Sequence, residues 1–495
     1  MEDEGVPSRV LMENAGRGAA LVLDRLFPSG PVVVVAGTGN NGGDGVVLAR
    51  SLRRFGRDVS LLVLGERPRP DPLLHAWPVP VETVPDHDGA LDAALARGAV
   101  LVDALLGTGV TGAPRARHAR VIRAMNRSRR PILALDLPSG LDADSGAVAG
   151  EAIRADLTVA FGFPKVGTVL FPGRELSGRL IVIEIGFPPL PEGLSSARLL
   201  TSEWIASHRP RRPLVTHKKA EGRLLIAAGS PGMAGAAILS ARAALRAGVG
   251  YVRVASPEEN RTAVQSSVPE ALFVDIAQDD ALSDALADSD AVAAGPGLGA
   301  GSGAGERLNG LLSEVEGQAV LLDADALTHL GNGALPAFAG AGEGERRILT
   351  PHPGEAVRIG ADPESLSGDV LGVARDLASR WNAAILLKGT PSIAAHPAGR
   401  EVLVATSGSS DLARAGMGDV LTGAAGALLA RGLKGWEASA LALHFTGLAA
   451  MRSGAGESLL PTDVIEGLAG ALREGDASTS GRLFPFVSLD LPPPH

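Results

Sequence analysis

Five glycines within nine residues stand beside three polar side chains in one early stretch of the chain. The stretch runs from Gly37 to Gly45, follows the apolar run Val32–Ala36, and includes Asn40, Asn41 and Asp44. Glycines at a strand-to-helix turn let backbone N–H groups approach a phosphate at the positive end of the helix. The side-chain oxygens can orient hydroxyl and amide groups or coordinate a hard cation. The alternative is an Asx-rich turn that holds no ligand.

Two further aspartates follow apolar runs in the same half of the chain. Asp103 leads into Gly107–Gly109, and Asp136 leads into Pro138–Asp142. Because the carboxyl ends of parallel strands share one edge of a sheet, these loops can converge with Gly37–Gly45 on a common crevice. A lone aspartate at a strand end usually caps a helix, but three such loops together favour a binding site.

The strongest single segment for chemistry lies late in the chain. In Ala413–Gly423 a glycine-bearing turn opens directly into a helix, with Asp419 at the helix start. Backbone N–H groups there would face an anion. An oxyanion site next to a carboxylate base suits phosphoryl transfer to a hydroxyl group. The alternative is that Asp419 only caps the helix.

Other loops of the second half follow apolar runs in the same way and together imply one long cleft. His352 lacks a second His or Cys at ligand spacing, so we expect it to contact substrate rather than zinc. Lys388 can contact phosphate and Glu355 can support water or magnesium, unless both are ordinary solvated charges. The loops are Gly229–Gly235, Gly295–Gly299, Asp323–Asp325, Thr350–Glu355 and Leu387–Pro391.

The elements that must position these residues are short Val/Ile/Leu/Ala runs alternating with helix-like segments. Continuous apolar runs of this kind are typical of buried parallel strands. In the first half, strands are predicted at Val32–Ala36, Val59–Leu64, Val100–Leu105, Ile132–Leu135, Leu157–Phe161 and Leu180–Ile185. In the second half, they are predicted at Leu224–Ala228, Val252–Ala255, Ala291–Ala294, Val320–Leu322, Arg347–Leu349 and Ala384–Leu387, with late helices at Asp419–Ala430 and Glu437–Met451.

These patterns predict an α/β fold in two domains, as a length of 495 residues also favours. Residues 1–200 are predicted to form a doubly wound domain, and residues 217–480 a second α/β domain. The prolines between Gly186 and Pro213 would block sheet pairing and helix continuation, so residues 201–216 are predicted to be a linker. The proline-rich tail, residues 481–495, is expected to fray from Phe484 onward.

Composition narrows the possible partners. The net charge of −9 and the lack of a long basic run argue against nucleic acid as a partner, and the absence of cysteine excludes disulfides and thiolate chemistry. The first residues lack a secretory pattern, and no apolar stretch reaches the ~20 residues that a bilayer-crossing helix needs. We therefore expect a globular cytoplasmic protein that contacts neither nucleic acid nor membrane.

The first half resembles the NAD(P)H-hydrate epimerase family over about residues 9–187, through Gly39–Gly45, Asp103–Gly109 and Asp136–Asp142. The resemblance implies a Rossmann-like domain that holds a potassium ion. Asp136 is our candidate for the proton transfer that epimerisation requires, with Lys165 as an assistant or as an ordinary surface lysine. The implied contacts to the hydrated dinucleotide are Asn40, Asn41, Gly42, Gly43, Asp44, Gly107, Thr108, Gly109, Val110, Thr111, Gly112, Ala113 and Asp136, and the implied potassium ligands are Asn41, Asp103 and Ser139.

The second half resembles the ribokinase-like superfamily, and within it the ADP- or ATP-dependent NAD(P)H-hydrate dehydratases, from about His217 to Leu468. Thr350–Glu355 and Gly295–Gly299 separate it from sugar kinases. The resemblance implies that ADP phosphorylates the ring hydroxyl, that phosphate is then eliminated, that magnesium balances the phosphate charge, and that Asp419 removes the hydroxyl proton. The implied substrate contacts are Ala236, Gly297, His352 and Asp419, and the implied nucleotide contacts are Lys388, Gly389, Thr390, Pro391, Ser392 and Gly418.

Together the two resemblances imply a bifunctional isomerase and lyase that repairs hydrated NADH and NADPH (NADHX and NADPHX), and a homo-oligomer is expected. Two alternatives remain open from the residues alone. One is a ribokinase-type kinase that releases a stable phosphorylated product. The other is a dinucleotide-sensing module that binds hydrated NADH without turnover.

Overall fold

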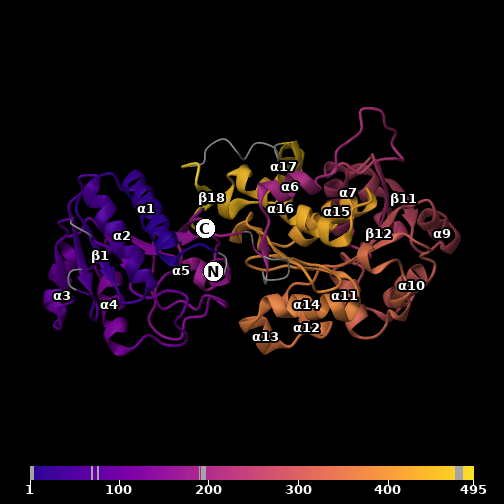
Figure 1. The fold of residues 1–495 in the computed structure, drawn as a ribbon. Coiled ribbons are helices and arrows are strands. Elements are labelled where there is room, and N and C mark those ends of the chain that lie inside the picture. Colours follow the sequence, from indigo (N-terminus) through magenta and orange to yellow (C-terminus); the bar gives the residue numbers. More distant parts are fainter. Residues whose placement is uncertain are drawn as a thin grey trace. The chain divides into compact units, whose positions relative to one another are not determined.

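The computed structural model describes residues 5–68, 71–74, 77–188, 190, 197–473 and 483–494. The chain divides into two compact units, the first formed by residues 1–191 with 480–495 and the second by residues 192–479. Each unit is a sheet with helices on its faces (Figure 1). The α/β fold that the sequence predicts is therefore confirmed in both halves.

The first unit is built on an eight-stranded sheet in the order β18-β7-β6-β5-β4-β1-β2-β3, parallel throughout except for β18. In a doubly wound sheet of this order, the chain reverses direction between β1 and β4, and ligands bind outside the carboxyl ends of the strands at that point. The strands are β1 (Val32–Ala36), β2 (Val59–Val63), β3 (Val81–Thr83), β4 (Val100–Ala104), β5 (Ile132–Leu135), β6 (Leu157–Phe161), β7 (Arg179–Ile183) and β18 (Val487–Leu491).

Helices cover both faces of this sheet, which explains the unbroken apolar runs of its strands. Alternate residues of β1 enter two different cores: Val34 packs with residues of α1 and α2, whereas Val33 and Val35 pack with residues of α3 and α4. Every residue of β1 is buried. The helices are α1 (Ser8–Leu26), α2 (Asn40–Arg54), α3 (Asp88–Ala96), α4 (Ala116–Arg127) and the short α5 (Gly173–Leu176).

The C-terminal tail does not fray, contrary to the expectation for residues 481–495. Within the described part of the tail, β18 pairs antiparallel with β7 at the edge of the first unit's sheet. Val487 is 1% exposed, and Arg179 donates to both carboxylate oxygens of Asp490, at 2.8 and 2.6 Å. The prolines flank the strand instead of interrupting it, so the ladder of Val487–Leu491 is intact.

The second unit holds a ten-stranded sheet in the order β11-β10-β9-β12-β13-β14-β15-β16-β17-β8. Its first seven strands are parallel, and its chain reverses direction between β9 and β12, as the first sheet does between β1 and β4. The strands are β8 (Arg198–Leu199), β9 (Arg223–Ala227), β10 (Tyr251–Ser256), β11 (Leu272–Asp275), β12 (Ala291–Ala294), β13 (Ala319–Leu322), β14 (Arg347–Leu349), β15 (Ala384–Leu387), β16 (Ile393–Ala395) and β17 (Val402–Val404).

Two groups of helices enclose this sheet (Figure 1). One face carries α6 (Ser202–His208), α7 (Ala234–Arg246), α8 (Arg261–Ser267), α15 (Met417–Ala430), α16 (Gly435–Ser453) and α17 (Pro461–Arg473). The other carries α9 (Asp279–Ala287), α10 (Ser302–Ser313), α11 (Asp325–Gly331), α12 (Pro353–Arg358), α13 (Pro363–Gly368) and α14 (Val370–Trp381). Small residues bring α15 against α7, since a Cβ on Gly423 would lie 2.1 Å from the carbonyl oxygen of Ser240. None of the helices that the structure describes is long and apolar enough to cross a bilayer.

The segment predicted as a linker differs from its prediction. Within residues 201–216, α6 packs into the core of the second unit, and β8, which is predicted to belong to the first domain, pairs with β17. Trp204 is 7% and Ile205 0% exposed, and Trp204 lies 5.7 Å from the ring of Trp436. Thr201 caps α6 by accepting a hydrogen bond from the backbone N–H of Trp204. Two buried apolar side chains thus outweigh the proline signal, while residues 189 and 191–196 lie outside the described part of the chain.

Candidate active sites

The glycine-rich stretch of the first unit is helical from an earlier residue than the sequence suggests. Helix α2 begins at Asn40, so Asn40–Gly45 forms its first turns instead of a loop. A Cβ on Gly42 would lie 2.0 Å from the carbonyl oxygen of Gly37, which no side chain could tolerate. These glycines therefore serve close packing of the helix on the strand end as well as access for a ligand.

Oxygen atoms from three loops converge beside this helix start. Asn41 donates to the carbonyl oxygen of Leu106 at 2.7 Å, and the hydroxyl of Ser139 donates to Asp103 at 2.6 Å. Leu106 in turn donates its backbone N–H to the Ser139 hydroxyl at 2.9 Å. A Cβ on Gly107 would lie 3.2 Å from the Cβ of Asn41. The loops after β1, β4 and β5 therefore meet, as the sequence predicts.

This oxygen cluster fits a monovalent cation. The side-chain oxygen of Asn41 is buried and has no hydrogen-bond partner, which is costly unless a cation or water meets it. Burial raises the pKa of Asp103 to about 6, although hydrogen bonds from Ser139 and Leu105 oppose the shift. A cation nearby would favour the charged carboxylate. The donors are amide, hydroxyl and carboxylate oxygens, the ligand types that hard cations prefer.

Asp136 stands at the carboxyl end of β5 beside Lys165. It adopts a φ of +68°, a left-handed conformation that is uncommon outside glycine. Lys165 donates to its carboxylate and also to the carbonyl oxygen of Phe161, at 3.2 Å, so Lys165 is not a free surface lysine. The pKa of Asp44 is raised to about 8, chiefly by burial and further by the charge of Asp136, while Lys165 lowers it. A strained backbone beside a carboxyl group with a raised pKa is typical of acid–base sites.

A pocket of about 480 Å³, part of it open to solvent, lies beneath this group of loops. Gly107, Val110 and Gly112 of the predicted dinucleotide contacts line it, together with residues from Leu137 to Ala149. The rest of the predicted contacts from Thr108 to Ala113 lie in an exposed loop at its edge. That loop is reachable by a large ligand.

The second site centres on the start of α15. Gly416 precedes the helix with a φ of +88°, and Asp419 lies in the first turn, as predicted. Burial raises the pKa of Asp419 to about 7, the charge of Asp323 raises it further, and Lys388 opposes both. A carboxylate poised near neutral pH at the positive end of a helix can act as a general base.

Asp323 and Lys388 form a buried ion pair next to Asp419. Lys388 contacts Asp323 at 2.7 Å and Glu355 at 3.6 Å, and Thr422, one turn after Asp419, donates to Asp323 at 2.6 Å. Burial alone would raise the pKa of Asp323, but the charge of Lys388 and hydrogen bonds from Lys388, Thr350 and Thr422 hold it below its usual value. The same carboxylates hold the pKa of Lys388 above its usual value despite burial.

Several predicted contact residues of the second unit are brought together. A Cβ on Gly297 would lie 3.1 Å from the Cβ of Ala236, and a Cβ on Gly418 would lie 3.7 Å from the ammonium of Lys388. Gly389 and Ser392 form a turn in which the Gly389 N–H donates to the Ser392 hydroxyl at 3.2 Å. This turn lies at the end of β15, on the opposite side of Asp323 from Gly297.

His352 has a structural task that the sequence did not suggest. Its Nδ1 accepts from the backbone N–H groups of Gly354 and Glu355, at 3.0 and 3.3 Å, so it caps α12. Glu355 completes the capping box by accepting from the backbone N–H of His352. Among the described residues, no three His, Asp or Glu side chains gather as a metal site.

Sequence reasoning missed Thr422 as a site residue and noted Asp325 only as part of the Asp323–Asp325 loop. Asp325 accepts from the backbone N–H of Gly299 at 2.8 Å and so fixes the Gly295–Gly299 loop. Thr422 is separated from Asp419 by three helical positions, which places both on one face, and that spacing could have revealed it. Asp323 was noted only as part of a strand-end loop, since pairing with a lysine 65 residues away leaves no local signal.

Comparison with known proteins identifies the family of the chain. A family model described as NAD(P)H-hydrate dehydratase matches residues 224–468, and one described as YjeF-related protein N-terminus matches residues 8–167. The bifunctional NAD(P)H-hydrate repair enzyme of Moorella thermoacetica is 37% identical over 500 residues, covering 94% of this chain and 93% of that protein. That of Escherichia coli is 34% identical over 454 residues, covering 87% and 82%.

The crystal structure of a ribokinase-like superfamily protein from Enterococcus faecalis has a TM-score of 0.51 and 23% identity, covering 58% of this chain and 99% of that chain. That likeness supports a ribokinase-like fold and nothing finer. The curated relatives match both halves of the chain in one alignment. The chain therefore belongs to the family of bifunctional NAD(P)H-hydrate repair enzymes, with an epimerase domain in its first half and an NAD(P)H-hydrate dehydratase domain in its second.

Proposed function

We propose that the second unit dehydrates the S hydrate of NADH or NADPH at the expense of ADP, with Asp419 as the general base. The position of Asp419 carries this proposal: it lies at the amino end of α15 with a pKa of about 7, beside the buried Asp323–Lys388 pair. Asp419 takes the proton of the ring hydroxyl while the hydroxyl oxygen bonds to the β-phosphorus and the bond to AMP breaks. The ring C–O bond then breaks, phosphate leaves, and loss of a proton from the adjacent carbon restores the C=C bond.

The remaining groups of this site bind and orient. Lys388 offers an ammonium to the phosphates of the nucleotide, supported by the Lys388–Ser392 turn and Gly418, and Ala236, Gly297 and His352 flank the acceptor. Magnesium would balance the phosphate charge. Since the described part of the chain offers no cluster of three acidic or histidine side chains, the ion would be held largely by the phosphates themselves.

We further propose that the first unit interconverts the R and S hydrates. Asp44, protonated at neutral pH, donates its proton to the hydroxyl oxygen as the ring C–O bond breaks and water leaves. Water then adds to the other face of the ring, and Asp136, held by Lys165, takes the proton that this water gives up. Potassium held by Asn41, Asp103 and Ser139 would fix the loops after β1, β4 and β5 and add positive charge near the substrate phosphates. Asn40, Gly42 and Gly43 would face those phosphates from the start of α2.

Product analysis tests the dehydratase proposal against a kinase. With the S hydrate, ADP and magnesium, we expect inorganic phosphate and NADH to appear in equal amounts. Phosphorus NMR measures the phosphate, and the absorbance of reduced nicotinamide measures the NADH. A stable phosphorylated hydrate without NADH would establish a kinase instead and would contradict the proposal.

Replacing potassium by a bulky organic cation should slow epimerisation at least tenfold and leave dehydration within twofold. The physical reason is that the buried oxygen of Asn41 and the carboxylate of Asp103 would lose their counter-charge, so the three loops would no longer be held together. Chiral separation of the hydrates measures the rate of epimerisation, and NADH recovery from the S form measures the rate of dehydration. Ser139→Ala should reproduce the loss even in full potassium, whereas an equal loss of both activities would argue against the site.

Asp136→Asn should slow epimerisation by about 10²- to 10⁴-fold, the usual contribution of a general base.

Asp44 sets a pH dependence of epimerisation, and its sign follows from the role of Asp44 as a proton donor. Since its active form is the protonated one and its pKa is about 8, epimerisation should fall as pH rises through that value. Asp44→Asn should remove the alkaline limb of the profile, and the exposed Asp88→Asn is the control. An unchanged alkaline limb in Asp44→Asn would rule out its proposed role.

A further inference from the structure

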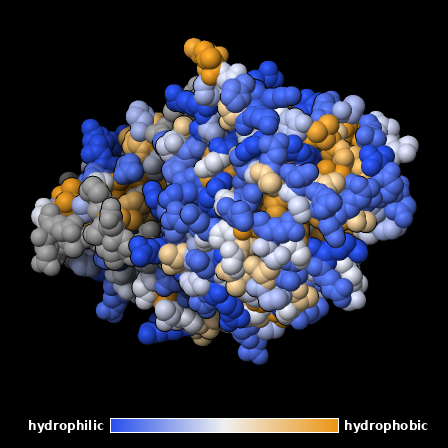
Figure 2. Space-filling view, turned by 90° about the vertical axis from the view of Figure 1, so that its right-hand side faces the viewer, coloured by the Kyte–Doolittle hydropathy of each residue, from blue (hydrophilic) through white to orange (hydrophobic). Residues whose placement is uncertain are grey.

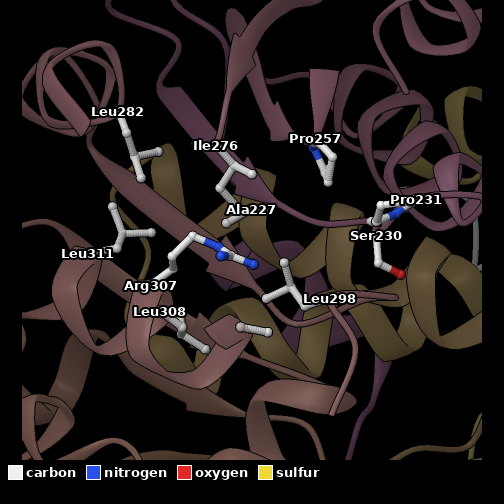
Figure 3. Close-up of a pocket in the computed structure, with 12 residues that line it drawn as sticks. Ala227, Ser230, Pro231, Pro257, Ile276, Leu282, Leu298, Arg307, Leu308 and Leu311 are labelled. Carbon is white, nitrogen blue, oxygen red and sulfur yellow. The ribbon is translucent and has the colours of Figure 1, made fainter. Parts of the chain in front are cut away.

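A second cavity lies where the strand order of the second unit reverses. Its space of about 440 Å³ is partly open to solvent, and it is reached from the ends of four neighbouring strands, β11, β10, β9 and β12. Gly229, Ser230 and Pro231 follow β9, Pro257 follows β10, Ile276 follows β11, and Leu298 lies in the loop after β12 (Figure 3). In open α/β sheets this is the position at which ligands bind.

The walls of this cavity are apolar and carry a single charge. Ile276, Leu282, Leu298 and Leu308 are each 9% exposed or less. Arg307 extends its guanidinium from α10 into the space between them (Figure 3). Nothing in the described part of the chain gives this guanidinium a hydrogen bond or an ion pair, in contrast to Arg223 and Arg253 on the neighbouring strands, which both pair with Asp288.

An apolar slot with one unpaired guanidinium fits a ligand that combines a flat apolar body with an anionic group. Guanidinium groups bind phosphate in a bidentate manner and stack on aromatic rings, whereas the apolar walls favour a ring system. The face that carries α9 and α10 is mostly hydrophilic, with apolar residues visible only in small patches (Figure 2). The apolar lining of the cavity therefore stands out from the surface around it.

The position of the cavity relative to Asp419 indicates which part of a substrate reaches it. Lys388 and the turn to Ser392 lie at the β15 side of Asp323, and Gly297 with Ala236 lies at the β9 and β12 side. In phosphoryl transfer the attacking and leaving oxygens are roughly in line, so donor and acceptor occupy opposite sides of the transferred group. If the nucleotide occupies the β15 side, the acceptor enters from β12 and β9, and its distal half extends toward β10 and β11.

The same loops line both places. Ala236 and Gly297 flank the proposed acceptor position, while Gly229 and Leu298, in the loops that lead to them, line the cavity. A Cβ on Gly297 would lie 3.6 Å from the Cα of Gly229. A molecule whose hydrated ring lies at Asp419 can therefore continue along these loops into the cavity without crossing another element.

We propose that this cavity receives the adenosine end of the hydrated dinucleotide, and that Arg307 binds the 2′-phosphate that distinguishes NADPHX from NADHX. The leucines and Ile276 contact the adenine ring, and the guanidinium pairs with the phosphate on the adjacent ribose. Arg307 thereby sets a preference for the phosphorylated substrate. The inference rests on the proposed dehydratase function and adds its substrate specificity.

The test compares wild type and Arg307→Ala with the S forms of NADPHX and NADHX, each with ADP and magnesium. Loss of a charge-assisted contact to phosphate should lower kcat/KM for NADPHX about 10- to 100-fold, with kcat/KM for NADHX within twofold and the KM for ADP unchanged. Arg307→Lys should retain part of the preference, because it keeps the charge without the bidentate geometry. Arg400→Ala removes an equal charge from the exposed turn between β16 and β17 and should change neither value.

Each outcome bears on one proposal only. If wild type converts neither hydrate, the dehydratase function fails, whatever the variant does. If wild type converts them and Arg307→Ala lowers both values equally, or changes neither, then the assignment of Arg307 to the 2′-phosphate is wrong while the dehydratase function stands.

Discussion

Asp419→Asn should lower the kcat of dehydration by about 10²- to 10⁴-fold, the range that a general base contributes. The amide keeps the size of the side chain at the start of α15 but cannot accept the hydroxyl proton. Nucleotide affinity should change little, since Lys388, the Gly389–Ser392 turn and Gly418 remain. The measurement is NADH recovery from the S hydrate, together with calorimetric titration of ADP.

The pH profile of dehydration follows from the same residue. Burial, followed by the charge of Asp323, raises the pKa of Asp419 to about 7. Because the active form of a base is the deprotonated one, kcat/KM should rise as pH increases through that value and level off above it. Asp323 stays charged across this range because its own pKa is held below its usual value.

A control separates loss of chemistry from loss of fold. Burying a carboxylate with a raised pKa costs stability at neutral pH, so Asp419→Asn should leave the melting temperature unchanged or raise it. Asp279→Asn, in the first turn of α9, removes a carboxylate from the same unit and should keep full activity. A rate within threefold of wild type for Asp419→Asn would show that Asp419 is not the general base.

Lys388→Met should destabilise the second unit by about 3–5 kcal/mol, as expected when one partner of a buried ion pair is removed. Asp323 is 1% exposed and would be left with Thr422 and Thr350 as its remaining side-chain donors. The free energy of unfolding in urea measures the loss. The variant should also bind ADP weakly, because the cationic contact to phosphate is gone.

The stability that this pair contributes has a defined pH window. Asp323 has a folded pKa below its ordinary 3.8, so its contribution is complete above that value and is lost as pH falls through the folded pKa. Lys388 has a folded pKa above its ordinary 10.5, so its contribution is complete below that value and is lost as pH rises through the folded pKa. Between these limits the pair should be insensitive to pH.

A double variant distinguishes an unpaired charge from a packing defect. In Asp323→Asn with Lys388→Met no buried charge remains, so most of the stability lost in Lys388→Met should return, although activity should not. Lys434→Met removes an exposed lysine that contacts Glu345 at 2.9 Å and should leave stability nearly unchanged. If the double variant is less stable than Lys388→Met, the electrostatic account is wrong.

The sequence predicted the strands that carry the sites because those strands are buried on both faces. Val32–Ala36, Ile132–Leu135, Leu157–Phe161, Ala291–Ala294, Arg347–Leu349 and Ala384–Leu387 agree with the structure at both ends. Polar residues at their carboxyl ends then had to share one edge of each sheet. The convergence of Asn41, Asp103 and Ser139 follows from that topology.

The features that the sequence did not predict depend on distant contacts. The tail strand Val487–Leu491 needs the edge of β7 to pair with, and the prolines beside it obscured its alternation. The Asp323–Lys388 pair joins the ends of β13 and β15, which are separated by β14 in the sheet and by 65 residues in the chain. Likewise, the early start of α2 at Asn40 depends on close packing of glycines against Gly37 and Ala104, which no local propensity reveals.

The central claim is that one chain both epimerises the hydrates and dehydrates them. Its most direct test incubates a mixture of R and S hydrates with the full-length protein, ADP, magnesium and potassium, and follows the absorbance of reduced nicotinamide. The account predicts that both epimers are converted to NADH, and that Asp136→Asn converts the S form rapidly while the R form remains. Rapid recovery from the S form alone by the unmodified protein would contradict the epimerase half, and recovery from neither would contradict the whole account.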